Sequence, residues 1–198
     1  MKKHITLAVV VLCGLCACFV SCNEEADEET WLFYAAYNSD GTIGSSGLTQ
    51  SEWESRLAFV QNKSTVVLSA DLGSDDLLAF AAALTSSGKT GITLDLGNLS
   101  IVSINASTFS GCTGVTSVVL PETVVSIGKD AFLGCTSLTS VTIGSGLIFV
   151  NKNAFSGCTS LTLVTYSGTT DDWEDILIAS GNECLTGAMV VCSDGVYS

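Results

Sequence analysis

Cysteine is the side chain best suited to chemistry in this sequence of 198 residues, which holds nine cysteines and one histidine. Cys112, Cys135 and Cys158 are spaced 23 residues apart. If they stack at one strand spacing, their Cα atoms lie within disulfide range, but side chains stacked in parallel lack the dihedral angle of about 90° that the bond prefers. Cysteine is also among the residue types most often buried. We therefore interpret these three residues as structural thiols.

Cys184 and Cys192 form a second group near the C-terminus. In an oxidising compartment they are a possible disulfide that would close a C-terminal loop. None of these five cysteines has C-x-x-C spacing. The sequence therefore predicts neither a zinc site nor a thioredoxin-type redox site.

The densest acidic run after the N-terminal region comprises Asp171, Asp172, Glu174 and Asp175. Carboxylates are the ligands that Ca²⁺ prefers, so calcium binding is the alternative interpretation of this run. Its spacing is not that of an EF-hand loop, and acids commonly lie at the start of a helix. We interpret the run as a solvated turn that leads into a helix, and we predict no metal and no cofactor.

The N-terminus has the pattern of a secretory signal peptide. Two lysines precede an apolar run over residues 5–20, which barely reaches the roughly 17 to 25 residues of a membrane span. An uncleaved membrane helix is the alternative. The sequence Phe-Val-Ser-Cys that ends at Cys22 resembles the lipobox of bacterial lipoproteins. The resemblance implies that residues 1–21 are a lipoprotein signal peptide and that Cys22 is acylated, with Cys18 as the rival site.

Residues 22–30 are rich in Asp and Glu, so they predict a solvated tether that cannot pack. An acidic stretch directly after a lipidated cysteine also resembles the surface-export signal of some Gram-negative, host-associated bacteria. That resemblance implies a surface-exposed lipoprotein of the bacterial outer membrane, which contacts the membrane through its lipid anchor only. An orientation towards the periplasm is the alternative.

The charge balance excludes several classes of function. Asp and Glu total 20 against seven Lys and Arg, which excludes a nucleic-acid binder built on a basic patch. Cleavage before Cys22 would remove two of the seven basic residues and the only histidine, His4. The mature chain could then hold no Ser-His-Asp triad, Cys-His pair or imidazole metal site. We predict that the protein is not an enzyme; a hydrolase would have to rest on the acidic run at Asp171.

A repeat of 23 residues organises the middle of the chain. Phe, Gly and Cys recur together over residues 109–112, 132–135 and 155–158. Each copy has a closely alternating apolar pair, such as Val118 and Leu120, which is typical of a short strand before an irregular return arm. One copy cannot bury its apolar face alone. We therefore predict coils stacked about 4.8 Å apart, with their strands paired.

The apolar positions of the repeat follow one template, and we expect them to point inward. They are Cys112, Val115, Val118, Leu120, Val124, Ile127, Ala131 and Phe132, then Cys135, Leu138, Val141, Ile143, Leu147, Val150, Ala154 and Phe155. Asn105, Gly128 and Asn151 share the position after the return-arm aliphatic residue. Because Gly and Asn tolerate positive φ best, we predict a left-handed backbone corner there.

Residues 31–90 predict a flanking segment that caps the first coil. A strand is expected over 31–37, and a Thr-x-x-Glu capping box starts a helix over 50–61. A second helix is expected over 75–85, with Ser74 as its N-cap. The aromatic residues of this segment are expected to pack on the solenoid, with an exposed aromatic binding platform as the alternative.

The segment 127–138, Ile-Gly-Lys-Asp-Ala-Phe-Leu-Gly-Cys-Thr-Ser-Leu, resembles the core of the BspA-type leucine-rich repeat. The likeness covers about residues 91–166, and residues 167–198, with a turn, a short helix and a strand over 189–192, resemble the C-terminal segment of the same family. The resemblance implies an α/β solenoid, a short leucine-rich repeat of 23-residue BspA-type coils with parallel strands on one face, a helical N-terminal cap and an αβ C-terminal cap.

The strand side chains that point away from the core are the surface that a solenoid offers to partners. The predicted partner-binding face consists of Thr93, Asp95, Ser117, Val119, Ser140, Thr142, Leu163 and Thr165. These residues are small and mostly neutral, and they lack the Trp, Tyr and Arg that dominate binding hot spots. We therefore expect weak or multivalent binding, or use of the aromatic N-terminal segment instead.

The family resemblance implies attachment. We predict a cell-surface anchored leucine-rich repeat lipoprotein that mediates protein–protein interaction or adhesion, with a protein or glycoprotein ligand on the host or on a neighbouring cell. The alternative is a structural accessory subunit of an outer-membrane assembly with no free ligand.

Overall fold

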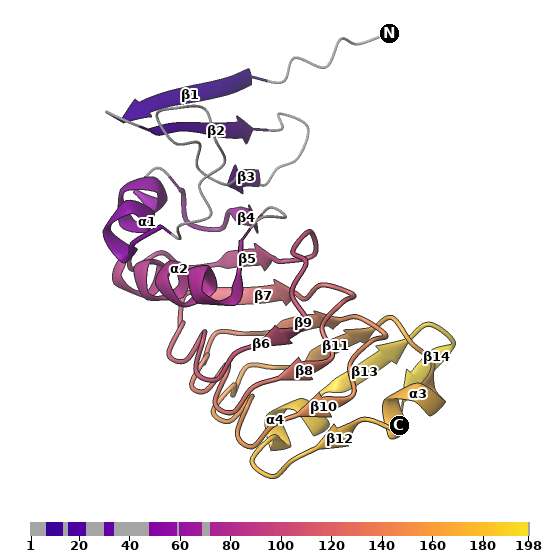
Figure 1. The fold of residues 1–198 in the computed structure, drawn as a ribbon. Coiled ribbons are helices and arrows are strands. Elements are labelled where there is room, and N and C mark those ends of the chain that lie inside the picture. Colours follow the sequence, from indigo (N-terminus) through magenta and orange to yellow (C-terminus); the bar gives the residue numbers. More distant parts are fainter. Residues whose placement is uncertain are drawn as a thin grey trace, which may run out of the picture.

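The computed structural model (Figure 1) describes residues 7–13, 16–22, 30–33, 48–58, 60–68 and 72–197, with side chains from residue 48 onward. The predicted acidic tether lies almost wholly outside the described residues, and the predicted strand over 31–37 is described only as far as Phe33. Near the N-terminus, β1 (Leu7–Cys13) and β2 (Cys16–Cys22) pair as an antiparallel hairpin. None of the helices in the described part of the chain has the length and hydropathy of a membrane span.

The main sheet has eight strands in the order β14-β13-β11-β9-β7-β5-β4-β3. Its neighbours are parallel except for β13 and β14, which are antiparallel. The bounds are β3 (Thr30–Phe33), β4 (Thr65–Leu68), β5 (Ile92–Asp95), β7 (Val115–Val119), β9 (Ser140–Ile143), β11 (Leu163–Tyr166), β13 (Met189–Cys192) and β14 (Gly195–Tyr197). Ser117, Ser140 and Leu163 pair in succession, so adjacent coils are offset by the 23-residue period.

A second sheet of four parallel strands is formed by the return arms, in the order β12-β10-β8-β6. Its strands are β6 (Ser103–Ile104), β8 (Ser126–Ile127), β10 (Phe149–Val150) and β12 (Leu177–Ile178). Each coil therefore passes through both sheets and encloses the core between them (Figure 1). The predicted solenoid of 23-residue coils is confirmed.

The core is a set of side-chain ladders that run along the solenoid. Every residue of the predicted inward template is buried. The rings of Phe109, Phe132 and Phe155 stack with centroids 5.3 and 5.1 Å apart and nearly parallel planes. The backbone between these rings is also paired from coil to coil, because Phe109 N donates to the carbonyl oxygen of Ala131 and Phe132 N to that of Ala154, both at 2.8 Å.

The predicted left-handed corner at Asn105, Gly128 and Asn151 is wrong. Positive φ angles lie two residues later instead, at Ser107 (58°), Asp130 (57°) and Asn153 (59°). The glycines of the Phe-x-Gly-Cys turns, Gly111, Gly134 and Gly157, also have positive φ, at 71–74°.

Position 128 requires glycine because there is no room for a Cβ atom between the two coils. A Cβ atom there would lie 2.6 Å from the backbone nitrogen of Ala106 and 2.7 Å from the backbone of Asn105 in the preceding coil. The two coils approach too closely at Gly128 itself for a Cβ atom on the present backbone.

In the part of the chain that the structure describes, four helices lie at the ends of the array: α1 (Gln50–Leu57), α2 (Ser74–Ser86), α3 (Thr170–Glu174) and α4 (Glu183–Thr186). The predicted capping box of α1 is present, but the helix ends at Leu57 rather than at residue 61. The N-cap of α2 is Gly73, one residue before the predicted Ser74, because Asp76 accepts a hydrogen bond from Gly73 N at 2.8 Å.

The two N-terminal helices cap the first rung of the core. Trp53 of α1 packs edge-on against Phe80 of α2, with ring centroids 5.1 Å apart, and both side chains are fully buried. On the next turns of α2, the Ala81 carbonyl oxygen and the Thr85 hydroxyl lie 3.7 and 3.3 Å from Cys112 Sγ. Helix α2 therefore closes the N-terminal end of the cysteine ladder.

Candidate functional site

The eight residues of the predicted partner-binding face are brought together by the main sheet in two rows. One row is Thr93, Ser117, Ser140 and Leu163, and the other is Asp95, Val119, Thr142 and Thr165. Every one of these side chains is at least partly exposed, while the residues between them in the strands are buried. The period-two alternation of the strands therefore separates this outward face from the core.

Hydroxyl groups on and beside this face bind neighbouring coils to one another. Ser140 Oγ donates to Ser117 Oγ at 2.9 Å, and Thr139 Oγ1 donates to the Thr116 carbonyl oxygen at 2.8 Å. Asp95 Oδ1 accepts from Gly97 N at 2.8 Å. These polar groups are engaged in structural bonds, so the face offers contact area rather than a nucleophile with an adjacent base.

The outward face extends beyond the residues predicted for it. In β13, Met189 pairs with Leu163 and Val191 with Thr165, so both continue the two rows. Val196 of β14 pairs with Val191 and is 57% exposed. The strand itself was predicted, but all four residues of Met189–Cys192 are apolar, so their sequence does not show which of them face outward.

A second outward set of apolar residues was missed by the sequence analysis. Val102, Val125, Ile148 and Leu177 are 41–66% exposed on the return-arm side of the solenoid. They form a ladder, because Val125 N, Ile148 N and Leu177 N donate to the carbonyl oxygens of Val102, Val125 and Ile148 at 2.8–3.0 Å. The signal was present in the sequence, since the first three members are spaced by the 23-residue period.

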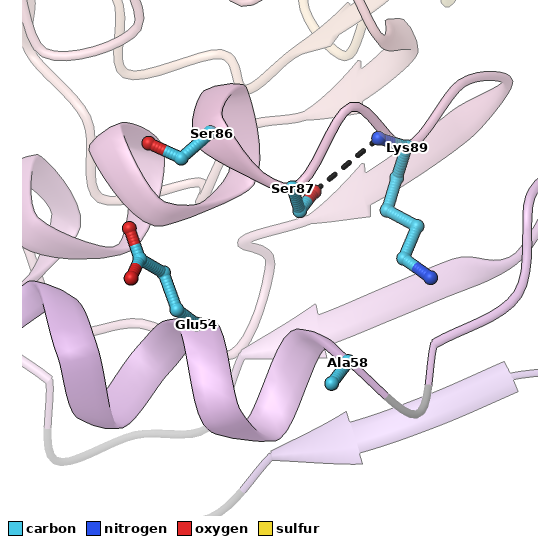
Figure 2. A pocket seen from close by; sticks show the side chains of 5 residues that line it. All are labelled: Glu54, Ala58, Ser86, Ser87 and Lys89. Atoms are coloured by element: carbon cyan, nitrogen blue, oxygen red, sulfur yellow. Dashed lines mark hydrogen bonds between the residues drawn. The ribbon is translucent and has the colours of Figure 1, made fainter.

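A shallow pocket of about 370 Å³ lies between α1 and the end of α2, lined by Glu54, Ala58, Ser86, Ser87 and Lys89. Figure 2 shows Glu54 and Ser86 on facing helices and the hydrogen bond from Lys89 N to Ser87 Oγ, 3.3 Å long. Gln50 Nε2 donates to Glu54 at 2.8 Å and to Ser86 at 3.2 Å. The polar groups of this pocket hold the two helices together and do not form a nucleophile–base pair.

The three central thiols are structural groups. Cys135 Sγ donates to the Phe109 carbonyl oxygen at 3.0 Å, and Cys158 Sγ donates to that of Phe132 at 3.1 Å. Burial raises the pKa of the Cys112 thiol, and hydrogen bonding to Cys158 together with burial raises the pKa of Cys135 well above its ordinary range. Cys112 and Cys135 are therefore protonated, buried thiols, which are not nucleophiles, whereas the hydrogen bond to Cys135 lowers the pKa of the Cys158 thiol.

Cys184 and Cys192 are both free in this structure, as are the other three cysteines whose side chains are described, and a disulfide between them stays a prediction. Cys184 lies in α4, which is followed by β13. Cys192 is the last residue of β13.

The acidic residues of the C-terminal cap act as helix and turn caps. Asp172 accepts hydrogen bonds from the hydroxyl and backbone N–H of Thr169 at 2.7 and 2.9 Å, which hold the pKa of its carboxyl below the ordinary value. Asp194 accepts from Thr170 N at 2.9 Å. Within the described residues, no group of three or more His, Cys, Asp or Glu side chains is placed to hold a metal ion.

Comparison with known proteins adds a family to this geometry. Residues 92–180 match the model of the "BspA type Leucine rich repeat region" in six copies. No curated protein shows significant similarity to the chain.

Two solved structures resemble the chain. A leucine rich cell surface protein from Faecalibacterium prausnitzii has 19% identity and a TM-score of 0.49, over 83% of this chain and 41% of that one. A leucine rich repeat protein from T. pallidum has 19% identity and a TM-score of 0.35, over 75% of this chain and 50% of that one. The chain therefore spans half or less of the length of either neighbour.

The matched region begins at β5 and ends just after β12, so it contains all the return-arm strands and the whole Phe ladder. Solenoids of this kind are typically binding scaffolds rather than enzymes. Residues 92–180 of the chain therefore form a BspA-type leucine-rich repeat region.

Proposed function

We propose that the chain is a cell-surface lipoprotein whose solenoid binds a protein or glycoprotein of the host or of a neighbouring cell. The observation that carries the proposal is the outward face of the main sheet. Its two rows run through β5, β7, β9 and β11 in register, and their side chains remain partly exposed. Such a face suits an extended contact with a macromolecule, because it is continuous and rigid.

The chemistry of the face supports modest affinity at each site. Its members are mainly hydroxyl and aliphatic side chains, and Asp95 is its single charged residue among the eight. A partner would gain area and shape complementarity there but no charged anchor. Several copies on one cell would then raise the apparent affinity through avidity.

Lipid anchoring through Cys22 would hold several copies of the chain on one cell surface. The anchor is tested by an experiment of its own. We expect metabolic labelling with a fatty-acid analogue to mark the full chain expressed in a Gram-negative host. Cys22→Ala should abolish the label, while the matched Cys18→Ala variant should retain it. Protease treatment of whole cells should release the domain; protection of the domain in intact cells would contradict the outward orientation.

The face itself is tested with Ser117→Arg and Thr142→Arg combined, which place bulky charges at the centre of the two rows. The matched control is Val102→Arg with Val125→Arg on the opposite side of the solenoid. The first pair should reduce attachment of the cells to host extracellular matrix at least tenfold, and the control pair should not. Equal attachment by both pairs, together with crosslinking to one stoichiometric protein of the same envelope, would favour the accessory-subunit alternative instead.

A further inference from the structure

The outward face changes its chemistry towards the C-terminal end of the sheet. Thr93, Ser117 and Ser140 are followed in the same row by Leu163 and Met189. In the second row, Val191 and Val196 follow Thr165. Met189 and Val196 are 55% and 57% exposed, so the last two strands present an apolar surface to solvent. Contiguous exposed apolar groups on an otherwise polar face mark interaction sites.

This apolar end coincides with an open sheet edge. Among the strands that the structure describes, β14 has β13 as its one hydrogen-bonded neighbour, and it forms the end of the eight-strand order (Figure 1). All three of its residues, Gly195–Tyr197, are exposed. The outer edge of such a strand offers backbone N–H and C=O groups to an incoming strand.

Acidic side chains surround this edge. Helix α3, which contacts β14, carries Asp171 and Asp172, and Asp194 lies in the turn between β13 and β14. Asp172 stays charged at neutral pH, because its hydrogen bonds from Thr169 lower the pKa of its carboxyl. The sequence beyond Lys152 contains six acidic residues and no Lys, Arg or His. Residues 153–198 therefore bring acidic groups and no basic group of their own to this end of the sheet.

The two sides of the edge differ. Val196 shares the outward face with Val191, whereas Tyr197 pairs with the buried Val190 and lies on the inner side. Helix α3 also lies on the inner side, since its Trp173 packs edge-on against the buried Tyr166 with centroids 5.3 Å apart. A strand added beside β14 would place alternate side chains on the two sides. One set would meet the apolar Val196, and the other would face the carboxylates of α3.

We propose that the C-terminal docking surface, defined as the β14 edge with Leu163, Met189, Val191 and Val196 and the acids Asp171, Asp172 and Asp194, takes an extended segment of a partner protein. In that segment apolar residues alternate with Lys or Arg, and it adds to the sheet as a strand beside β14. The inference rests on the proposed binding function and names a partner chemistry for it. A second copy of this chain fits less well, because edge-to-edge pairing would bring two sets of the same acids together.

The test uses the full chain and a ten-residue peptide of alternating Val and Lys with blocked ends. The peptide should bind, and raising NaCl from 50 to 500 mM should weaken it severalfold because the carboxylates become screened. A Val–Glu peptide of the same length should bind at least tenfold more weakly. A Val–Lys peptide N-methylated at every second residue should also lose at least tenfold, since it cannot complete the backbone pairing.

Two substitutions with matched controls localise the site. Val196→Lys should weaken peptide binding at least tenfold, whereas Val102→Lys, at a similarly exposed valine on the other sheet, should change it less than twofold. Asp171→Lys should weaken it about fivefold. Asp75→Lys makes the same charge change in the first turn of α2 and should have no effect. Thermal unfolding of each variant establishes that it is folded.

Equal binding of the Val–Glu peptide, or equal effects of Asp171→Lys and Asp75→Lys, would overturn the proposal. So would concentration-dependent dimers that Val196→Lys abolishes, because they would make a second copy the occupant. If the peptide does not bind but Ser117→Arg with Thr142→Arg still reduces cell attachment, the docking inference fails and the proposed function stands.

Discussion

Within one coil, the turn that carries the Phe and the strand repeat with the same period. They differ in how much the residue type varies from coil to coil. Phe132 is 1% exposed and stacks between Phe109 and Phe155. Thr142, ten residues later, is partly exposed and is flanked in its row by Val119 and Thr165. The inward position holds Phe in all three coils, while the outward position holds Val in one coil and Thr in the other two. The period therefore fixes the scaffold and leaves the chemistry of the face free to change along it.

The largest expected effect on stability is at the buried Phe position of the repeat. Phe132→Ala removes the middle ring of the ladder and should lower the free energy of unfolding by about 3–5 kcal/mol. Urea titration of the purified chain measures the loss. Phe149→Ala is the matched control, because Phe149 lies on β10 and is partly exposed. Equal losses in the two variants would show that stacking along the core is not what stabilises the array.

A smaller effect is expected where two coils approach closely. Gly128→Ala would bring a Cβ atom within 2.7 Å of the backbone at Asn105 and Ala106, so the coils must separate locally. The cost should be about 1–3 kcal/mol by the same titration. Gly134→Asn is the control, because that glycine has open space around its Cβ position and a φ of 71°, which Asn tolerates. A larger loss in the control would make backbone conformation, and not space, the limiting factor.

The buried positions of the repeat could be predicted from the sequence, whereas the backbone conformation of its corner could not. The inward template was predictable because burial repeats with the coil, and burial selects apolar residue types. The left-handed corner was not, because Ser107, Asp130 and Asn153 share no residue type, and Gly128 satisfies a spacing demand that only neighbouring coils create.

The outward face was predictable as far as the repeats extend. Its register follows from the period and its exposure from strand alternation. The apolar continuation on β13 and β14 lies outside the repeats. The 23-residue period therefore does not predict which residues of these strands pair with the preceding coil.

The C-terminal cap gives a prediction of how the stability of the fold depends on pH. The pKa of the Asp172 carboxyl is lowered from its ordinary value of 3.8 by the hydrogen bonds from Thr169. A depressed pKa means that its stabilising contribution is complete above the unfolded value and is lost as pH falls through the folded one. Below pH 3.8 the unfolding temperature of the parent chain should therefore fall more steeply than that of Asp172→Asn. Thr169→Val, which removes one donor, should flatten the slope in part; an unchanged slope in both variants would refute this assignment.

The smallest effect on stability is expected on the outward face, and a reciprocal exchange of two neighbouring residues in β9 isolates it. Thr142→Val replaces a hydroxyl with a methyl on the exposed side of the strand and should change the free energy of unfolding by less than about 0.5 kcal/mol. Val141→Thr places the hydroxyl on the buried side, where Val141 is 1% exposed, and should cost about 1–3 kcal/mol. The same atoms are exchanged at adjacent positions, so helix, strand and repeat propensities cancel to first order. If Thr142→Val leaves stability unchanged yet alters attachment of cells to host matrix, the outward row serves contact alone. An equal cost for both variants would mean that the hydroxyl rows also stabilise the fold. The proposed difference between buried and exposed positions of the coil would then be wrong.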